Sequence, residues 1–208
     1  MMSMIQVESV SPPLNSPEVA SLAVRILSVA EAMGLLPGRD PIRQLDRGVL
    51  ERIAKNAATS AGIGRDVLAD LRRADRADRM EPAVRRLYEA LERSPAPATE
   101  WRSLVAVIGT DLLAQLLGTS GSSLRRYLAG TRRTPDVVAD RLHFIALVVA
   151  DLAGSYNDLG LRRWFERPRV LLGGKSPAQL LKGEWRVDDA GPARVRELAY
   201  ALTAPLGT

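Results

Sequence analysis

The sequence predicts an all-α fold, and three observations support this prediction. Apolar residues recur at three- and four-residue spacing in most of the chain, and proline and glycine interrupt these runs. Aromatic residues are few, with three Trp, four Tyr and two Phe among 208 residues, which suits helices packed through Leu, Val and Ala. We expect four parts: a flexible tail at residues 1–16, a helical N-terminal domain at 17–96, a helix-turn-helix domain at 97–154 and a small helical module at 155–208.

The N-terminal domain shows helix signals but no residue pattern that carries chemistry. Ser16 followed by Pro17 is a hydroxyl cap with proline at the first helical position, and the helix should end at Gly34. Further helical segments are expected at about residues 49–57, at 67–71 and from Glu81 onward. The alternating charges at residues 71–79 are typical of a solvated helix face. We interpret this domain as a helical packing or oligomerisation module.

A linker is expected at residues 94–98, where two prolines within five residues resist helix formation. Thr99 should cap the next helix, which contains Trp101. Thr134 followed by Pro135 repeats the helix-start signal, and the helix predicted at residues 137–152 is apolar almost all round. A helix of this kind is buried, either in its own core or in a dimer interface.

Residues 110–135 predict a helix-turn-helix. Gly118 lies where the chain must turn sharply, and glycine tolerates the positive φ of such a turn. Ala114 is small where the two helices would cross. The apolar contacts between the helices are expected from Leu113, Leu117, Leu124, Tyr127 and Leu128.

The second helix of this motif, at about residues 121–129, carries short hydroxyls and arginines on its polar side, and a basic loop follows it. These side chains suit base edges and phosphates in a DNA major groove. We therefore predict DNA contacts from Ser120, Ser122, Ser123, Arg125, Arg126, Arg132 and Arg133. The alternative is a helical hairpin within an all-helical core, because the same apolar pattern would also produce it.

Composition and charge limit the classes of protein. The net charge is +5, and residues 97–208 hold 15 basic and 11 acidic side chains against 14 and 13 in residues 1–96. The absence of cysteine excludes disulfides, thiolate catalysis and Cys-ligated zinc. The N-terminus does not resemble a signal peptide, and the apolar run at 144–152 is too short to span a bilayer. We expect a cytoplasmic protein with no metal and no cofactor.

A second motif follows residue 154. A helix is predicted at residues 156–166, with Leu159, Leu161, Trp164 and Phe165 as its apolar side. Leu-Gly-Gly at residues 172–174 predicts a turn, Ser176 caps a short helix, and a last helix is expected at residues 192–202. Taken by themselves, these residues specify a structural helical hairpin and no chemistry.

The segment RRWFERPRVLLGGKSPAQLL follows the helix-turn-helix and precedes a helix with Gly191, Val195 and Leu198, and together they resemble the MbcA/ParS/Xre antitoxin family. The resemblance covers about residues 100–205, and the Leu-Gly-Gly-x-Ser-Pro core is its most specific part. The matching residues are Trp164, Phe165, Pro168, Leu172, Gly173, Gly174, Ser176, Pro177, Leu180 and Leu181. Residues 1–98 have no counterpart in it.

The resemblance implies an antitoxin of a type II toxin-antitoxin system, whose partner is a RES-domain toxin that degrades NAD. In that family the helix-turn-helix represses the operon, and the C-terminal end of the chain enters the toxin's active-site cleft. Toxin contacts are then expected from Trp164, Leu172, Gly173, Gly174, Lys175, Ser176, Arg194 and Leu198. Residues 183–186, Gly-Glu-Trp-Arg, depart from the small and acidic residues usual in the family, which would alter the partner surface.

Catalytic patterns are weak, and no enzyme is expected. The single histidine, His143, lies on an apolar helix, which favours a core or interface residue over a catalytic base. Asp188 and Asp189 are adjacent in a loop and do not face a common point. Gly-Lys-Ser at residues 174–176 lacks the first glycine of a phosphate loop, because position 169 is an arginine.

The leading hypothesis is an antitoxin and autorepressor that, as a homodimer, places two recognition helices in successive major grooves of its operator. The main alternative is a helix-turn-helix transcriptional regulator without a toxin, whose N-terminal domain senses a ligand or a protein. A helical adaptor that binds only protein is the third interpretation.

Overall fold

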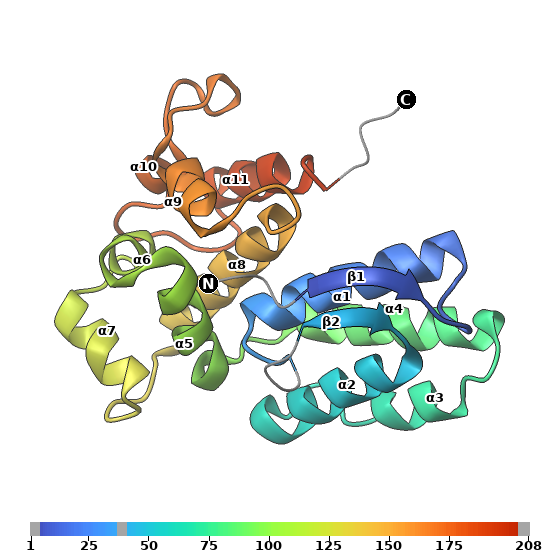
Figure 1. The fold of residues 1–208 in the computed structure, drawn as a ribbon. Helices are drawn as coiled ribbons and strands as arrows, with labels where there is room; N and C mark the ends of the chain where they lie inside the picture. The colour runs from blue at the N-terminus through green and yellow to red at the C-terminus, as the bar shows by residue number, and fades with distance from the viewer. Residues whose placement is uncertain (1–4, 37–40, 204–208) are drawn as a thin grey trace. The chain divides into compact units, whose positions relative to one another are not determined.

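The computed structural model describes residues 5–36 and 41–203 (Figure 1). The chain divides into two compact units between Ala96 and Pro97, here called the N-terminal unit and the C-terminal unit. Helices dominate both units, and the β-structure of the described residues is a single two-stranded sheet. The all-α class predicted from the sequence is confirmed.

The two-stranded sheet lies in the N-terminal unit and was not predicted. Strand β1 (Ile5–Val10) pairs in parallel with β2 (Ile42–Leu45), and Ile5 lies opposite Ile42. The prediction of a flexible tail at residues 1–16 is therefore wrong for residues 5–16, where Leu14 is fully buried. Residues 1–4 lie outside the described residues. The short strands escaped prediction because each is stabilised by a partner more than thirty residues away, which no local pattern encodes.

Four helices complete the described part of the N-terminal unit: α1 (Pro17–Ala32), α2 (Arg47–Ala61), α3 (Val67–Arg73) and α4 (Ala77–Arg93). α1 packs chiefly on α4 and begins as its sequence predicts, with the Ser16 hydroxyl accepting from the Val19 amide at 3.4 Å. α4 begins at Ala77, earlier than the predicted start at Glu81, so Pro82 lies inside the helix. A proline at this position removes one backbone donor, which the apolar face of α4 outweighs.

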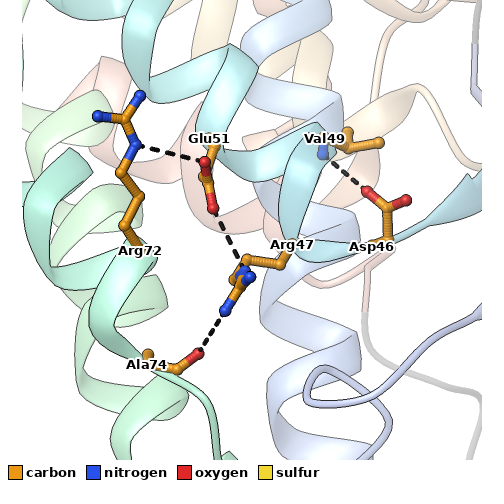
Figure 2. A network of polar contacts seen from close by, with 6 residues as sticks. All are labelled: Asp46, Arg47, Val49, Glu51, Arg72 and Ala74. Carbon is orange, nitrogen blue, oxygen red and sulfur yellow. Dashed lines mark hydrogen bonds and ion pairs between the residues drawn. The ribbon is translucent and has the colours of Figure 1, made fainter.

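A group of polar contacts joins α2 to α3 (Figure 2). Asp46 caps α2 by accepting from the Val49 amide at 2.9 Å. Glu51 lies between two arginines, with its oxygens 3.3 Å from Arg47 Nε and 3.5 Å from Arg72 Nε. Because all three side chains are partly exposed, the group positions the two helices without adding much stability.

The C-terminal unit contains only helices in its described residues. They are α5 (Pro97–Ile108), α6 (Thr110–Leu117), α7 (Gly121–Leu128), α8 (Asp136–Leu152), α9 (Asp158–Glu166), the 3-10 helix η1 (Val170–Leu172), α10 (Pro177–Leu180) and α11 (Ala190–Tyr200). α5 begins at Pro97, so the predicted linker at residues 94–98 is shorter and Thr99 lies inside the helix. Proline fits there because the first helical residue needs no amide donor.

α8 is the central helix of the C-terminal unit and packs against α5, α6 and α11. Its side chains are buried continuously from Arg141 to Leu152, which places it in the core of the unit. The expected boundary between residues 154 and 155 has no counterpart, because the described residues from Pro97 onward cluster as one unit. Within the described ranges, no helix combines the length and the apolar character needed to cross a membrane.

Candidate nucleic-acid interface and partner-binding module

α6 and α7 form the helix-turn-helix that the sequence predicts. Gly118 adopts a left-handed conformation with φ +63°, and the Thr119 amide donates to the Ala114 carbonyl at 3.0 Å. The predicted contacts Leu113, Leu117, Leu124 and Tyr127 are buried between the helices. Leu128 is not among them: it is 36% exposed, because it follows Tyr127 by about 100° around α7 and faces away from α6.

Trp101 of α5 fixes the orientation of α7 from behind. Its ring stacks on Tyr127 with 5.5 Å between the centroids, and its indole N–H donates to the Thr134 hydroxyl at 2.9 Å. Through these two contacts Trp101 holds both α7 and the end of the basic loop. The exposed face of α7 is therefore presented on a rigid support.

The predicted DNA-binding residues lie at the N-cap of α7, on α7 and in the loop that follows it, but they are not equivalent. Ser120 is the N-cap of α7 and accepts from the Ser123 amide at 3.1 Å, so its hydroxyl serves the helix rather than a free surface. Ser123 is half-buried. Ser122, Arg125 and Arg126 are exposed on α7 and remain suitable for contact with base edges and phosphates.

The basic loop after α7 also projects into solvent, and each of its arginines has a neighbour. The Arg132 guanidinium lies over the Tyr127 ring at 5.5 Å, which orients it beside α7. Arg133 is 3.2 Å from Asp136, in an ion pair whose two side chains are both strongly exposed. An exposed pair is weak, so a phosphate could displace the carboxylate.

Residues 183–186 lie against the helix-turn-helix. Trp185 is buried and donates from its indole N–H to the Leu116 carbonyl at 2.9 Å. Arg141 of α8 donates to the Leu117 carbonyl at 3.1 Å and to the Trp185 carbonyl at 2.6 Å. The expectation that this segment alters the partner surface is wrong for Trp185, because its side chain is buried and serves as the donor for the Leu116 carbonyl near the end of α6.

The Leu-Gly-Gly-x-Ser-Pro segment builds a tight loop followed by a capped helix. Gly173 and Gly174 have φ values of +67° and +80°, which explains why glycine stands at both positions. Ser176 and Gln179 form a capping box: the Ser176 hydroxyl accepts from the Gln179 amide at 3.2 Å, and the Gln179 side chain accepts from the Ser176 amide at 2.8 Å. The two glycines thus allow the tight turn of the loop, and the capping box fixes where α10 begins.

The residues predicted to bind a partner divide into two groups. Trp164, Leu172 and Ser176 are buried in the C-terminal unit, so as direct partner contacts they are corrected to core residues. The exposed or half-buried members are Gly173, Gly174, Lys175, Arg194 and Leu198. Leu159, predicted on the apolar side of α9, is instead 56% exposed, because helical periodicity places it on a different side of α9 from the buried Leu161 and Trp164.

Two exposed residues escaped the sequence interpretation. Val170 and Leu171 in η1 are 94% and 73% exposed, although Leu172 beside them is buried. The signal was present as a run of three apolar residues between Pro168 and the two glycines, but the pattern did not show which of the three faces inward.

His143 is a core residue, as its apolar surroundings predict. Its Nδ1 lies 2.6 Å from Oε1 of Glu100, a fully buried carboxyl group on α5. The role of Glu100 was not predicted, because its partner is 43 residues away. The pair joins α5 to α8 behind the helix-turn-helix.

Comparison of the chain with protein-family models, with curated proteins and with solved structures gave no match. Residues 204–208, the C-terminal end that the family resemblance assigns to the toxin cleft, lie outside the described residues.

Proposed function

We propose that this protein is an antitoxin of a type II toxin-antitoxin system, which binds operator DNA through α6–α7 and blocks a RES-domain toxin through the C-terminal part of the same unit. The observation that carries the proposal is the exposed arginine face of α7 on a rigidly held helix-turn-helix. The resemblance of residues 100–205 to the MbcA/ParS/Xre family supports the toxin as the second partner.

Two kinds of DNA contact are expected. Ser122, Arg125 and Arg126 lie on α7 and would face base edges, whereas Arg132 and Arg133 lie in the following loop and would face the backbone. As a homodimer the protein would read two half-sites one helical turn apart. Because backbone contacts carry no sequence information, the two groups should respond differently to substitution.

The DNA-binding part is tested by titrating the full chain into its own promoter duplex and into a scrambled duplex at several salt concentrations. Arg125→Ala with Arg126→Ala should remove the preference for the promoter. Arg132→Ala with Arg133→Ala should weaken binding to both duplexes alike and reduce the salt slope by about 0.9 for each lost phosphate contact.

A matched control is the pair Arg85→Ala and Arg93→Ala on α4, which removes the same charge from exposed positions of the N-terminal unit. This pair should leave promoter affinity nearly unchanged. Unaltered affinity and preference in the Arg125 and Arg126 variant would show that α7 does not read DNA.

The toxin part predicts that a gene beside this one encodes a RES-domain protein, and the test uses the protein which that gene encodes. Purified toxin should hydrolyse NAD, and the full chain should inhibit it stoichiometrically and restore growth on co-expression. Truncation after Leu152 is unsuitable, because Trp185 and α11 cover α6 and α8. Undiminished NAD hydrolysis with excess chain would contradict the proposal.

The second candidate is a transcriptional regulator whose N-terminal unit senses a ligand. It is favoured by a surface cleft at the α3–α4 corner, lined by Asp70, Arg73, Asp78, Arg79 and Arg86 among others. Arg86 is already ion-paired to Asp66 and Asp70, so part of the cleft's charge is neutralised internally. A neighbouring gene without a RES domain, together with promoter binding by the chain alone, would select this candidate.

A further inference from the structure

The most exposed apolar side chains of the described chain stand together on the loop between α9 and α10. Val170 is 94% and Leu171 is 73% exposed, whereas the next most exposed, Leu159 and Val137, reach 56% and 50%. Figure 1 shows this segment as an orange loop that stands out beyond α9 and α10. We call Val170 and Leu171 the apolar tip.

The apolar tip is held in place by hydrogen bonds around it. The Gly173 amide donates to the Val170 carbonyl at 2.9 Å, and the Leu172 and Gly174 amides both donate to the Arg169 carbonyl at 3.0 Å. Leu172 is buried directly behind the tip. Residues ordered before binding lose little entropy on docking, so the tip is suited to insertion into a pocket.

α11 also supports the apolar tip. The Arg194 guanidinium donates to the Leu171 carbonyl at 2.8 Å, and the Arg169 amide donates to the Lys175 carbonyl at 3.0 Å across the base of the loop. Two exposed apolar side chains therefore occupy a position that the fold has braced from two sides. Surface-exposed apolar residues of this kind mark interaction sites when they are clustered.

The chain segment that carries the apolar tip is basic. Residues 162–182 hold six basic side chains and one acidic side chain, an excess that equals the net charge of the whole protein, +5. Arg167 and Lys175 flank the tip on both sides and are exposed. A partner that accepts the tip should therefore have an acidic rim, since complementary charge governs encounter and orientation.

We propose that the apolar tip is the anchor by which the C-terminal unit docks on a protein partner, inserting Val170 and Leu171 into an apolar pocket with an acidic rim. This inference rests on the proposed function, in which that partner is the toxin. DNA is a less suitable partner for the apolar tip, because its phosphates would bind the arginines but not the two apolar side chains. Buried apolar anchors surrounded by a polar rim are the usual source of binding energy at an interface.

The test compares Val170→Ser with Leu171→Ser in one full-length variant against Val137→Ser with Leu159→Ser in a second. Both variants replace two exposed apolar residues of the C-terminal unit, so both should unfold at the temperature of the unaltered protein. The probe is the RES-domain protein that the proposed function predicts from the adjacent gene, titrated into each variant by calorimetry. The tip variant should bind at least tenfold more weakly and the control variant within twofold, with promoter affinity unchanged in both.

A third variant, Arg167→Glu with Lys175→Glu, should lower the association rate, and more at low salt than at high salt. Normal toxin binding by the tip variant would refute the docking role of the apolar tip and would leave the proposed function intact. No toxin binding by the unaltered chain would overturn both. Binding to vesicles of anionic phospholipid that the tip variant loses, without any effect on the toxin, would assign the tip to a membrane and refute the docking role.

Discussion

The carbonyl oxygen of Gly183 occupies the space that a β-carbon on Gly118 would need. Gly118 forms the turn between α6 and α7, and Gly183 belongs to the loop that leads from α10 to α11. The turn glycine is thus required twice: once for its positive φ, and once because the C-terminal segment passes directly over it. The helix-turn-helix and the segment after α10 are therefore packed against each other.

Gly118→Ala is expected to destabilise the C-terminal unit by clearly more than Gly130→Ala. Gly130 has a similar φ, +70° against +63°, but nothing lies within 4 Å of its hypothetical β-carbon. The control should therefore cost only the left-handed backbone strain, about 1–2 kcal/mol. Urea unfolding followed by tryptophan fluorescence measures this, since all three Trp residues lie in the C-terminal unit. Equal losses in the two variants would contradict the close approach of Gly183.

Trp185→Phe is expected to reduce the free energy of unfolding by about 1–3 kcal/mol, because the buried Leu116 carbonyl loses its donor. A phenylalanine can retain the edge contact with Phe144, which lies 5.2 Å away between ring centroids. Trp185→Ala should cost more, roughly 3–5 kcal/mol, since the ring volume is also lost. Chemical unfolding followed by far-ultraviolet circular dichroism measures the free energy of unfolding of both variants. A phenylalanine variant as stable as the unaltered protein would show that the hydrogen bond to the Leu116 carbonyl contributes nothing to stability.

His143→Leu is expected to destabilise the C-terminal unit by about 2–3 kcal/mol, because it removes a partner of the fully buried Glu100 carboxyl group. Replacing both residues by leucine should recover a large part of that loss, since an apolar pair leaves no polar group without its partner. A double-mutant cycle from urea unfolding gives the coupling energy. Additive effects of the two substitutions would show that the pair contributes nothing as a pair.

Ser176→Ala and Gln179→Ala should each lower stability by about 0.5–2 kcal/mol, because each removes half of the capping box at the start of α10. The double variant should lose less than the sum, since the two bonds depend on the same local geometry. Ser155→Ala, at an exposed position, is the control and should change stability little. Tryptophan fluorescence during thermal unfolding is a suitable readout, and full additivity would argue against a reciprocal cap.

Local signals explain why so much of the helical fold was predictable. Ser16 with Pro17 begins α1, Gly118 ends α6, and Ser120 begins α7, and each of these effects is decided within one helical turn. The same holds for the double glycine and the capping box that precede α10. Wherever a boundary depends on the residue's own backbone preference, sequence and structure agree to within a few residues.

The candidate site was predictable in part. The exposed positions of α7 followed from helical periodicity, which places Ser122, Arg125 and Arg126 on one side and Leu124 and Tyr127 on the other. The periodicity did not show that the Ser120 hydroxyl serves as a cap. For the partner-binding residues the resemblance identified a segment, but it could not separate the buried Leu172 from the exposed Leu171.

The sequence by itself determined the helical class, the helix-turn-helix and the capped turn of the second motif, because these depend on interactions between residues a few positions apart. Only the tertiary structure decided that residues 5–10 pair with residues 42–45, that Trp185 closes the end of α6 69 residues away, and that Glu100 meets His143 in the core. Each of these contacts satisfies a buried polar group or an unpaired strand with a distant partner. Such pairings depend on how the helices come together, and that arrangement leaves no local trace in the chain.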